Sequence, residues 1–157
     1  MNSLGDNKEG LFIWKNFNSI ISHLIDFCDI TKNIVVILKI AKKFFKTKPK
    51  LAEYSARCLV IINQKIKDDY TLINIENVLN EIYNLLIEFE KSEPDLQLKN
   101  KMERNIIITA RNLINELVKV KKEKLLEDYN NWSNKNDIKK EKYILKWINE
   151  RDRKSVV

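Results

Sequence analysis

The sequence predicts an all-α protein, either an antiparallel helical bundle or a short stack of helical pairs, with six to seven helices. Both glycines, Gly5 and Gly10, lie near the N-terminus, so residues 11–157 contain none. Tight hairpins, β-bulges and phosphate-binding loops need glycine, which disfavours β-sandwiches, Rossmann folds and P-loop proteins. Apolar residues also recur at spacings of three and four along most of the chain, which is typical of amphipathic helices.

The length of 157 residues fits one domain. Residues 1–10 are polar and show no periodicity, so we expect a disordered lead-in there. Residues 11–153 are expected to form a single all-α domain, and residues 154–157 a frayed tail. An apolar stripe then predicts the first helix, formed by Ile13, Phe17, Ile20, Leu24 and Phe27.

Helix-start signals separate the next two predicted helices. Asp29 and Thr31 offer a turn and an N-cap. Pro49 fits the first turn of the third helix, where its missing N–H costs nothing, and the segment 67–71 ends that helix. The stripes consist of Ile34, Leu38, Ala41 and Phe45 in the second helix, and of Leu51, Ser55, Cys58, Ile62 and Ile66 in the third.

The fourth predicted helix buries Ile75, Val78, Ile82, Leu85 and Phe89, and its opposite face presents Asn77, Asn80 and Asn84 to solvent.

Three further signals divide the rest of the chain. Ser92 and Pro94 repeat the cap-and-proline start. A long helix then runs from Met102 towards Trp132, with a possible break in the lysine-rich segment 119–124. Asn136 or Asp137 caps a last helix. The stripes consist of Ile106, Ala110, Leu113, Leu117 and Val120 in the long helix, and of Ile138, Leu145 and Ile148 in the last one.

Charge alternates along the chain. The net charge of +7 arises largely from 24 lysines, a residue with AT-rich codons. Residues 32–67 hold ten basic groups and one acid (+9), residues 68–95 one basic group and eight acids (−7), and residues 119–157 twelve basic groups and seven acids (+5). A genome-wide codon bias does not explain this alternation of sign.

The +9 segment predicts a basic patch for a partner. The alternative is a solvated face that pairs with the acidic fourth helix of the same domain. A basic surface favours an acidic polymer or a nucleic acid as the partner. The sequence does not show the aromatic residues on a sheet that stack on bases in proteins that bind single strands. The patch consists of Lys39, Lys42, Lys43, Lys46, Lys48 and Lys50.

No catalytic site is expected. Ser19, His23 and Asp26 share one helical face, but a continuous helix provides neither an oxyanion hole nor an exposed nucleophile. One histidine and two distant cysteines, Cys28 and Cys58, are too few for a structural zinc. We therefore predict a protein that is not an enzyme and needs no cofactor or metal.

Cysteine usage and hydropathy predict the location of the chain. Two isolated cysteines fit a reduced intracellular protein. The sequence shows no basic, apolar-cored signal peptide and no apolar run long enough to span a membrane, so we expect a cytoplasmic protein. Trp132 and Trp147 lie in a polar, lysine-rich region, where they are predicted to be aromatic anchors for a partner, the alternative being packing on a neighbouring helix.

The order of several short motifs resembles the C-terminal helical domain of the regulatory subunit of katanin, the microtubule-severing enzyme. The resemblance covers residues 29–120, although a tryptophan expected just before Asp29 is absent and the connection at residues 44–50 is longer and more basic. The motifs are Asp29–Ile34, Ile37–Lys39, Ala56–Leu59, Thr71–Leu72, Val78–Leu79, Leu85–Leu86, Lys101, Arg104 and Leu113–Ile114.

This resemblance implies a non-catalytic regulatory or targeting subunit. Its helical surface would bind helices of the severing ATPase subunit, and its basic surface would hold the acidic microtubule. Two alternatives remain: a basic helical protein that binds nucleic acid, and a helical protein that self-assembles into an oligomer through its +9 and −7 segments.

Overall fold

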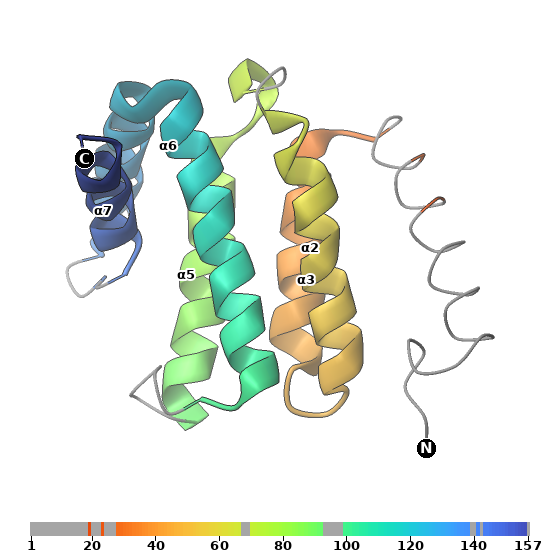
Figure 1. Cartoon of the computed structure of the whole chain (residues 1–157). Coiled ribbons are helices and arrows are strands. Elements are labelled where there is room, and N and C mark those ends of the chain that lie inside the picture. The colour runs from red at the N-terminus through yellow and green to blue at the C-terminus, as the bar shows by residue number, and fades with distance from the viewer. Residues whose placement is uncertain are drawn as a thin grey trace.

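The computed structural model describes residues 19, 23, 28–66, 70–92, 99–138, 141 and 143–156. In these residues the chain is all helical, which confirms the predicted all-α class. Five α-helices lie there, fewer than the six or seven expected. The first expected helix lies outside the described residues apart from Ser19 and His23. The elements are α2 (Ile30–Phe44), α3 (Pro49–Asn63), the 3₁₀-helix η1 (Tyr70–Leu72), α5 (Ile75–Ser92), α6 (Lys101–Lys135) and α7 (Ile144–Val156) (Figure 1).

The starts of α2 and α3 follow the predicted signals. The Asp29 carboxylate accepts a hydrogen bond from the Lys32 N–H at 3.2 Å, so Asp29 is the N-cap of α2. Pro49 occupies the first turn of α3. One position of the predicted stripe is wrong: the Leu51 side chain is 42% exposed, because it projects from the first turn of α3 at the end of the molecule, and Ala52 is buried instead.

The predicted stripe of α5 is fully buried, from Ile75 to Phe89. Of the three asparagines on its other face, Asn77 is exposed and Asn80 and Asn84 are half-buried. The expected cap at Ser92 is wrong for α6, because Ser92 is the last residue of α5 and α6 begins only after Asn100. Pro94 lies outside the described residues. The N-cap of α6 is Asn100, whose Oδ1 accepts a hydrogen bond from the Glu103 N–H at 2.9 Å.

The predicted break in the segment 119–124 is confirmed. Lys121 has a non-helical backbone (φ −152°, ψ 80°) and kinks α6. Residues 122–135, the second half of α6, turn back towards α5 (Figure 1). There the rings of Tyr83 and Trp132 lie 5.6 Å apart, and Lys135 Nζ lies 3.2 Å from Glu76 Oε1.

The end of α6 and the start of α7 differ from the prediction. Asn136 ends α6 and does not cap α7. The Ile138 N–H donates to the Ser133 carbonyl at 3.0 Å, and Asp137 adopts a left-handed φ of 51°, as in a Schellman motif. Glu141 caps α7 instead. Of the expected stripe, only Ile148 is buried; Ile138 lies before the helix and Leu145 is exposed.

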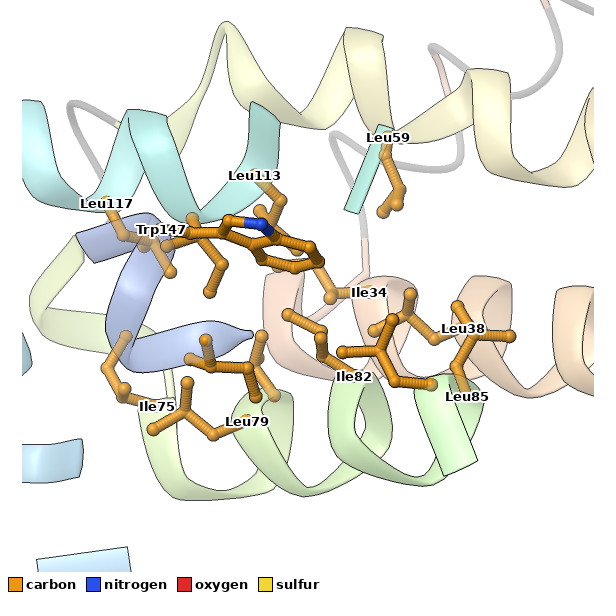
Figure 2. Close-up of a cluster of buried hydrophobic side chains, with 14 of the residues drawn as sticks. Ile34, Leu38, Leu59, Ile75, Leu79, Ile82, Leu85, Leu113, Leu117 and Trp147 are labelled. Atoms are coloured by element: carbon orange, nitrogen blue, oxygen red, sulfur yellow. The ribbon is translucent and has the colours of Figure 1, made fainter. Parts of the chain in front are cut away.

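Helices α2 and α3 form one antiparallel pair, and α5 and residues 101–120 of α6 form a second. The pairs stack so that α2 packs on α5 and α3 packs on α6, while α7 packs on α6 (Figure 1). Figure 2 shows Ile34 and Leu38 of α2 beside Ile82 and Leu85 of α5 in the shared core. The described helices therefore bury one continuous apolar core.

Candidate partner-binding surfaces

The lysines in the middle of α2 face the acidic helix α5. Lys39 Nζ lies 3.8 Å from Glu81 Oε1. The pKa of Glu88 is lowered, chiefly by its hydrogen bond from Lys91 and also by the charges of Lys42 and Lys46. The alternative of internal pairing between the +9 and −7 segments therefore holds for this part of the predicted basic patch.

The lysines at the end of α2 and in the turn to α3 are placed differently. Lys43 and Lys48 lie over the ring of Phe44, with their Nζ atoms 5.3 and 5.7 Å from its centroid, and Lys46 Nζ lies 5.5 Å from the centroid of Phe45. Each is exposed. In the described part of the chain none of the three forms an ion pair. The charge of Lys46 still acts on Glu88 of α5, whereas the charges of Lys43 and Lys48 face solvent.

The start of α6 extends this basic surface. Lys50 and Lys101 are exposed in the first turns of α3 and α6, and a cavity of about 520 Å³ lies between these two turns. We call the set Lys43, Lys46, Lys48, Lys50 and Lys101 the basic end.

The N-terminus of α3 carries lysines and no acid. Its first turn contains no acid, and its N-cap, Lys48, makes no side-chain capping hydrogen bond. Lysines at this position add positive charge to the positive end of the helix dipole, which costs a few tenths to about 1 kcal/mol per group at low salt. An anion bound at this end would relieve that repulsion.

Trp132 and Trp147 are core residues. Their exposed fractions are 1% and 6%, so the prediction that they are exposed anchors is wrong. The kink at Lys121 folds residues 122–135 onto α5, where Trp132 packs between Tyr83 and Tyr129. Figure 2 shows Trp147 beside Leu113 and Leu117 of α6. The alternative of packing on neighbouring helices is therefore correct for both residues.

In the part of the chain that the structure describes, the candidate catalytic and metal-binding residues do not come together in a reactive cluster. His23 Nδ1 lies 2.7 Å from the main-chain oxygen of Ser19, a helical contact that does not involve the serine hydroxyl. Asp26 lies outside the described residues. Burial raises the pKa of the Cys58 thiol to about 11, which leaves it protonated and unreactive at neutral pH. No group of three or more metal-ligating side chains occurs in the described part of the chain.

Sequence reasoning missed a buried lysine at the basic end. Lys99 Nζ donates to the main-chain oxygen of Phe89 and lies 3.7 Å from Glu103 Oε2. It thus places a cation at the carbonyl end of α5, where the helix dipole favours one. No local pattern marks Lys99, because its acceptor is ten residues away.

Comparisons with protein-family models, with curated proteins and with solved structures find no match to this chain. None of the helices in the described ranges has the length and apolar character needed to cross a membrane.

Proposed function

We propose that this protein is a non-catalytic, all-α interaction module that binds an acidic segment of a partner through its basic end. The observation that supports this function best is the contrast between two sets of lysines. Lys39 and Lys42 face acids on α5, whereas Lys43, Lys48 and Lys50 carry exposed charge without an ion pair among the described residues. The second set is available for long-range, salt-sensitive attraction.

The fuller proposal is a cytoplasmic regulatory or targeting subunit that resembles the katanin regulatory domain. The resemblance covers residues 29–120 and so ends just before the kink at Lys121. The acidic partner would then be the microtubule surface, and the second partner a helix of a severing ATPase. Val60 of α3 and Ile108 of α6, 51% and 52% exposed on two helices that pack together, are the apolar contacts we assign to that helix.

Charge reversal at the basic end tests the acidic partner. In Lys48→Glu/Lys50→Glu, acids replace lysines at the N-terminus of α3, where the helix dipole favours acids, so the fold should be retained. We expect microtubule affinity to fall about tenfold or more, because attraction becomes repulsion. The matched control is Lys32→Glu/Lys121→Glu, which changes two exposed lysines elsewhere by the same charge and should bind within about twofold of the parent.

Three further outcomes decide between partner classes. Binding that disappears when the acidic tubulin tails are removed supports the proposal. Salt-dependent binding to single-stranded DNA with no binding to microtubules would favour the nucleic-acid alternative. A parent chain that elutes as an oligomer at low salt and as a monomer at high salt would favour self-assembly. If the charge-reversed and control variants bind microtubules equally, the basic end is not the binding surface.

A separate pair of substitutions tests the helical partner. Val60→Asp/Ile108→Asp should abolish co-purification with the helices of a severing ATPase, because it places two charges on the apolar contact. Microtubule binding through the basic end should persist. Leu72→Asp, at another exposed apolar position, is the control. Loss of the ATPase helices in that control would show that the Val60 and Ile108 surface is not specific.

A further inference from the structure

Helix α2 carries a second apolar stripe, which the described helices leave partly open to solvent. Its inner stripe, which includes Ile34 and Leu38, lies in the core. Val36, Ile40 and Phe44 follow one another at spacings of four on another side of the helix. Val36 is 53% exposed, and the other two residues are half-buried. We call these three residues the outer stripe.

Among the described helices, α3 and α5 cover two sides of α2, and the outer stripe lies on a third. The α5 side is marked by Lys39, whose Nζ lies 3.8 Å from Glu81 Oε1. The side of the α2–α3 pair that is turned away from α5 and α6 carries no described helix (Figure 1). Because apolar side chains are stabilised when they leave water, another helix placed on this side would stabilise the outer stripe.

The segment directly before α2 has the sequence pattern of a helix that needs such a partner. Residues 11–27 lie outside the described residues apart from Ser19 and His23, which are helical and exposed, as expected for positions outside an apolar stripe. An amphipathic helix of this length gains most of its stability from packing of its apolar face. The side chains of that predicted face are Ile13, Phe17, Ile20, Leu24 and Phe27.

The short connection to α2 favours an antiparallel pair. Only Cys28 and Asp29 separate Phe27 from the first residue of α2. Helices joined by about two to five residues commonly pack side by side and antiparallel. A helix over residues 11–27 would be about 25 Å long, and α2, with 15 residues, is about 22 Å long. The segment therefore has the length needed to cover α2 from end to end.

We propose that residues 11–27 form a helix that docks on the outer stripe of α2. Both contact faces are apolar, so no charge is buried when they meet. The segment is then an intrachain ligand, and another helix can reach the outer stripe only by displacing it. This inference goes beyond the proposed function, because it concerns neither the basic end nor the contact at Val60 and Ile108.

The antiparallel arrangement predicts which residues meet. With the turn at residues 28–29, Ile20 and Val36 lie at nearly equal distances from the turn along the two helices. The first test is therefore disulfide formation in full-length Ile20→Cys/Val36→Cys. The exposed Cys28 is replaced by serine in this chain, and Cys58 is kept, since it is buried.

We expect an intrachain disulfide under glutathione oxidation, because a disulfide needs Cβ atoms about 3.8 Å apart. The matched control is Ile20→Cys/Val60→Cys, since Val60 is 51% exposed and Val36 is 53% exposed. The yield should be at least tenfold lower in the control. Equal yields would overturn the proposal. Disulfides that form only between chains would identify a second copy as the occupant and would also overturn it.

Hydrogen exchange gives the second arm. Val36→Asp places a charge on the outer stripe at an exposed position, so the described helices should stay folded. Amides of residues 13–27 should exchange at least tenfold faster than in the parent, because the docked helix opens, while those of α5 should be unchanged. Val60→Asp is the control and should leave residues 13–27 protected. Unchanged exchange of residues 13–27 in Val36→Asp would contradict the proposal.

A competition experiment gives the third arm. In full-length Phe17→Asp/Leu24→Asp the segment carries two charges on its apolar face and should not dock. A free peptide of residues 11–27 should bind this variant at least tenfold more tightly than the parent, where the tethered segment competes at millimolar effective concentration. Equal affinity for the two chains, including absence of binding to both, would refute the inference.

Microtubule binding separates this inference from the proposed function. Phe17→Asp/Leu24→Asp should bind microtubules as the parent does, because its basic end is intact. If the disulfide, exchange and peptide experiments fail while Lys48→Glu/Lys50→Glu still loses microtubules, the docking of residues 11–27 is refuted and the proposed function stands.

Discussion

Residues 30–120 and residues 122–156 meet at the kink in α6 and are stabilised by different kinds of contact. The first region buries mainly aliphatic side chains from four helices, such as Ile34, Leu59 and Leu85, together with one aromatic pair, Phe45 and Phe89, whose ring centroids lie 4.5 Å apart. The second packs aromatic rings, with Trp132 against Tyr129 and Trp147 near Tyr143. Polar side chains cap helices in both regions, Asp29 and Asn100 in the first and Glu141 in the second.

The difference is not one of length, since α2 and α3 contain 15 residues each and α7 contains 13. It lies in the contacts that join residues 122–135 and α7 to the rest of the protein, which include large rings and an ion pair. The Arg111–Glu150 ion pair at 2.7 Å joins α7 to the first half of α6. The second region is therefore more sensitive to single polar substitutions than the first.

Removal of the Trp132 ring has the largest expected effect. Trp132→Ala should lower the free energy of unfolding by about 3–5 kcal/mol, because it leaves a cavity between α5 and α6. Urea denaturation measures this loss. Leu85→Ala in the first region is the comparison, with an expected loss of about 2–5 kcal/mol.

Amide hydrogen exchange shows whether the two regions are separate. In Trp132→Ala we expect faster exchange in α7 than in α2, because local opening follows the lost contacts. Equal loss of protection in α2 and α7 would break the comparison and show that the two regions unfold as one cooperative unit.

The cap of α7 has the next largest effect. The Glu141 carboxylate accepts hydrogen bonds from the N–H groups of Tyr143 and Ile144 at 2.6 and 2.5 Å, and from that of Leu145 at 3.2 Å. Glu141→Ala should cost about 1–2 kcal/mol, because it leaves these donors without an acceptor. Thermal unfolding measures this loss of stability. The exposed Glu123→Ala should change stability by less than about 0.5 kcal/mol, and equal effects of the two substitutions would exclude a capping role.

For two buried tyrosines, removal of the hydroxyl group should change the stability of the protein in different directions. The Tyr129 hydroxyl donates to Glu141 Oε2 at 2.7 Å, so Tyr129→Phe should destabilise by about 1 kcal/mol. The Tyr70 hydroxyl is buried without a partner among the described residues. Tyr70→Phe should therefore be neutral or stabilising by up to about 1 kcal/mol. Denaturation at neutral pH compares them, and a larger loss for Tyr70→Phe would reverse the expected order.

Tyr70 also predicts how the stability of the protein changes at alkaline pH. Burial, assisted by the charge of Asp128, raises the pKa of Tyr70 from 10 to about 12. The unfolded chain loses this proton at lower pH than the folded chain, so the contribution is constant below pH 10 and is lost as pH rises towards 12. The urea midpoint of the parent should therefore fall above pH 10, and it should fall less in Tyr70→Phe. An unchanged pH profile would show that Tyr70 does not titrate differently in the two states.

Local signals predicted the first region better than the second. Asp29, Pro49 and the α5 stripe act through neighbours within one helical turn, so spacing was sufficient to find them. Trp132 and Lys99 could not be placed, because Trp132 meets Tyr83 through the kink in α6 and Lys99 meets a carbonyl ten residues away. The asparagines on the outer face of α5 were assigned to solvent by the same spacing, and they lie there, with Asn77 exposed and Asn80 and Asn84 half-buried.

The smallest expected effect concerns the turn that ends α6. Asp137 adopts a left-handed φ of 51° at the position where glycine is common, and the chain has no glycine after Gly10. Asp137→Gly should stabilise by about 0.5 kcal/mol, because glycine adopts this conformation without steric cost. Asp137→Ala should destabilise by about 1 kcal/mol, because alanine retains the Cβ clash and lacks a polar side chain. Thermal unfolding should therefore rank glycine above aspartate and aspartate above alanine. If the alanine variant is as stable as the parent, the turn is not a point of strain, and the greater sensitivity of the second region rests on its rings and on Glu141 alone.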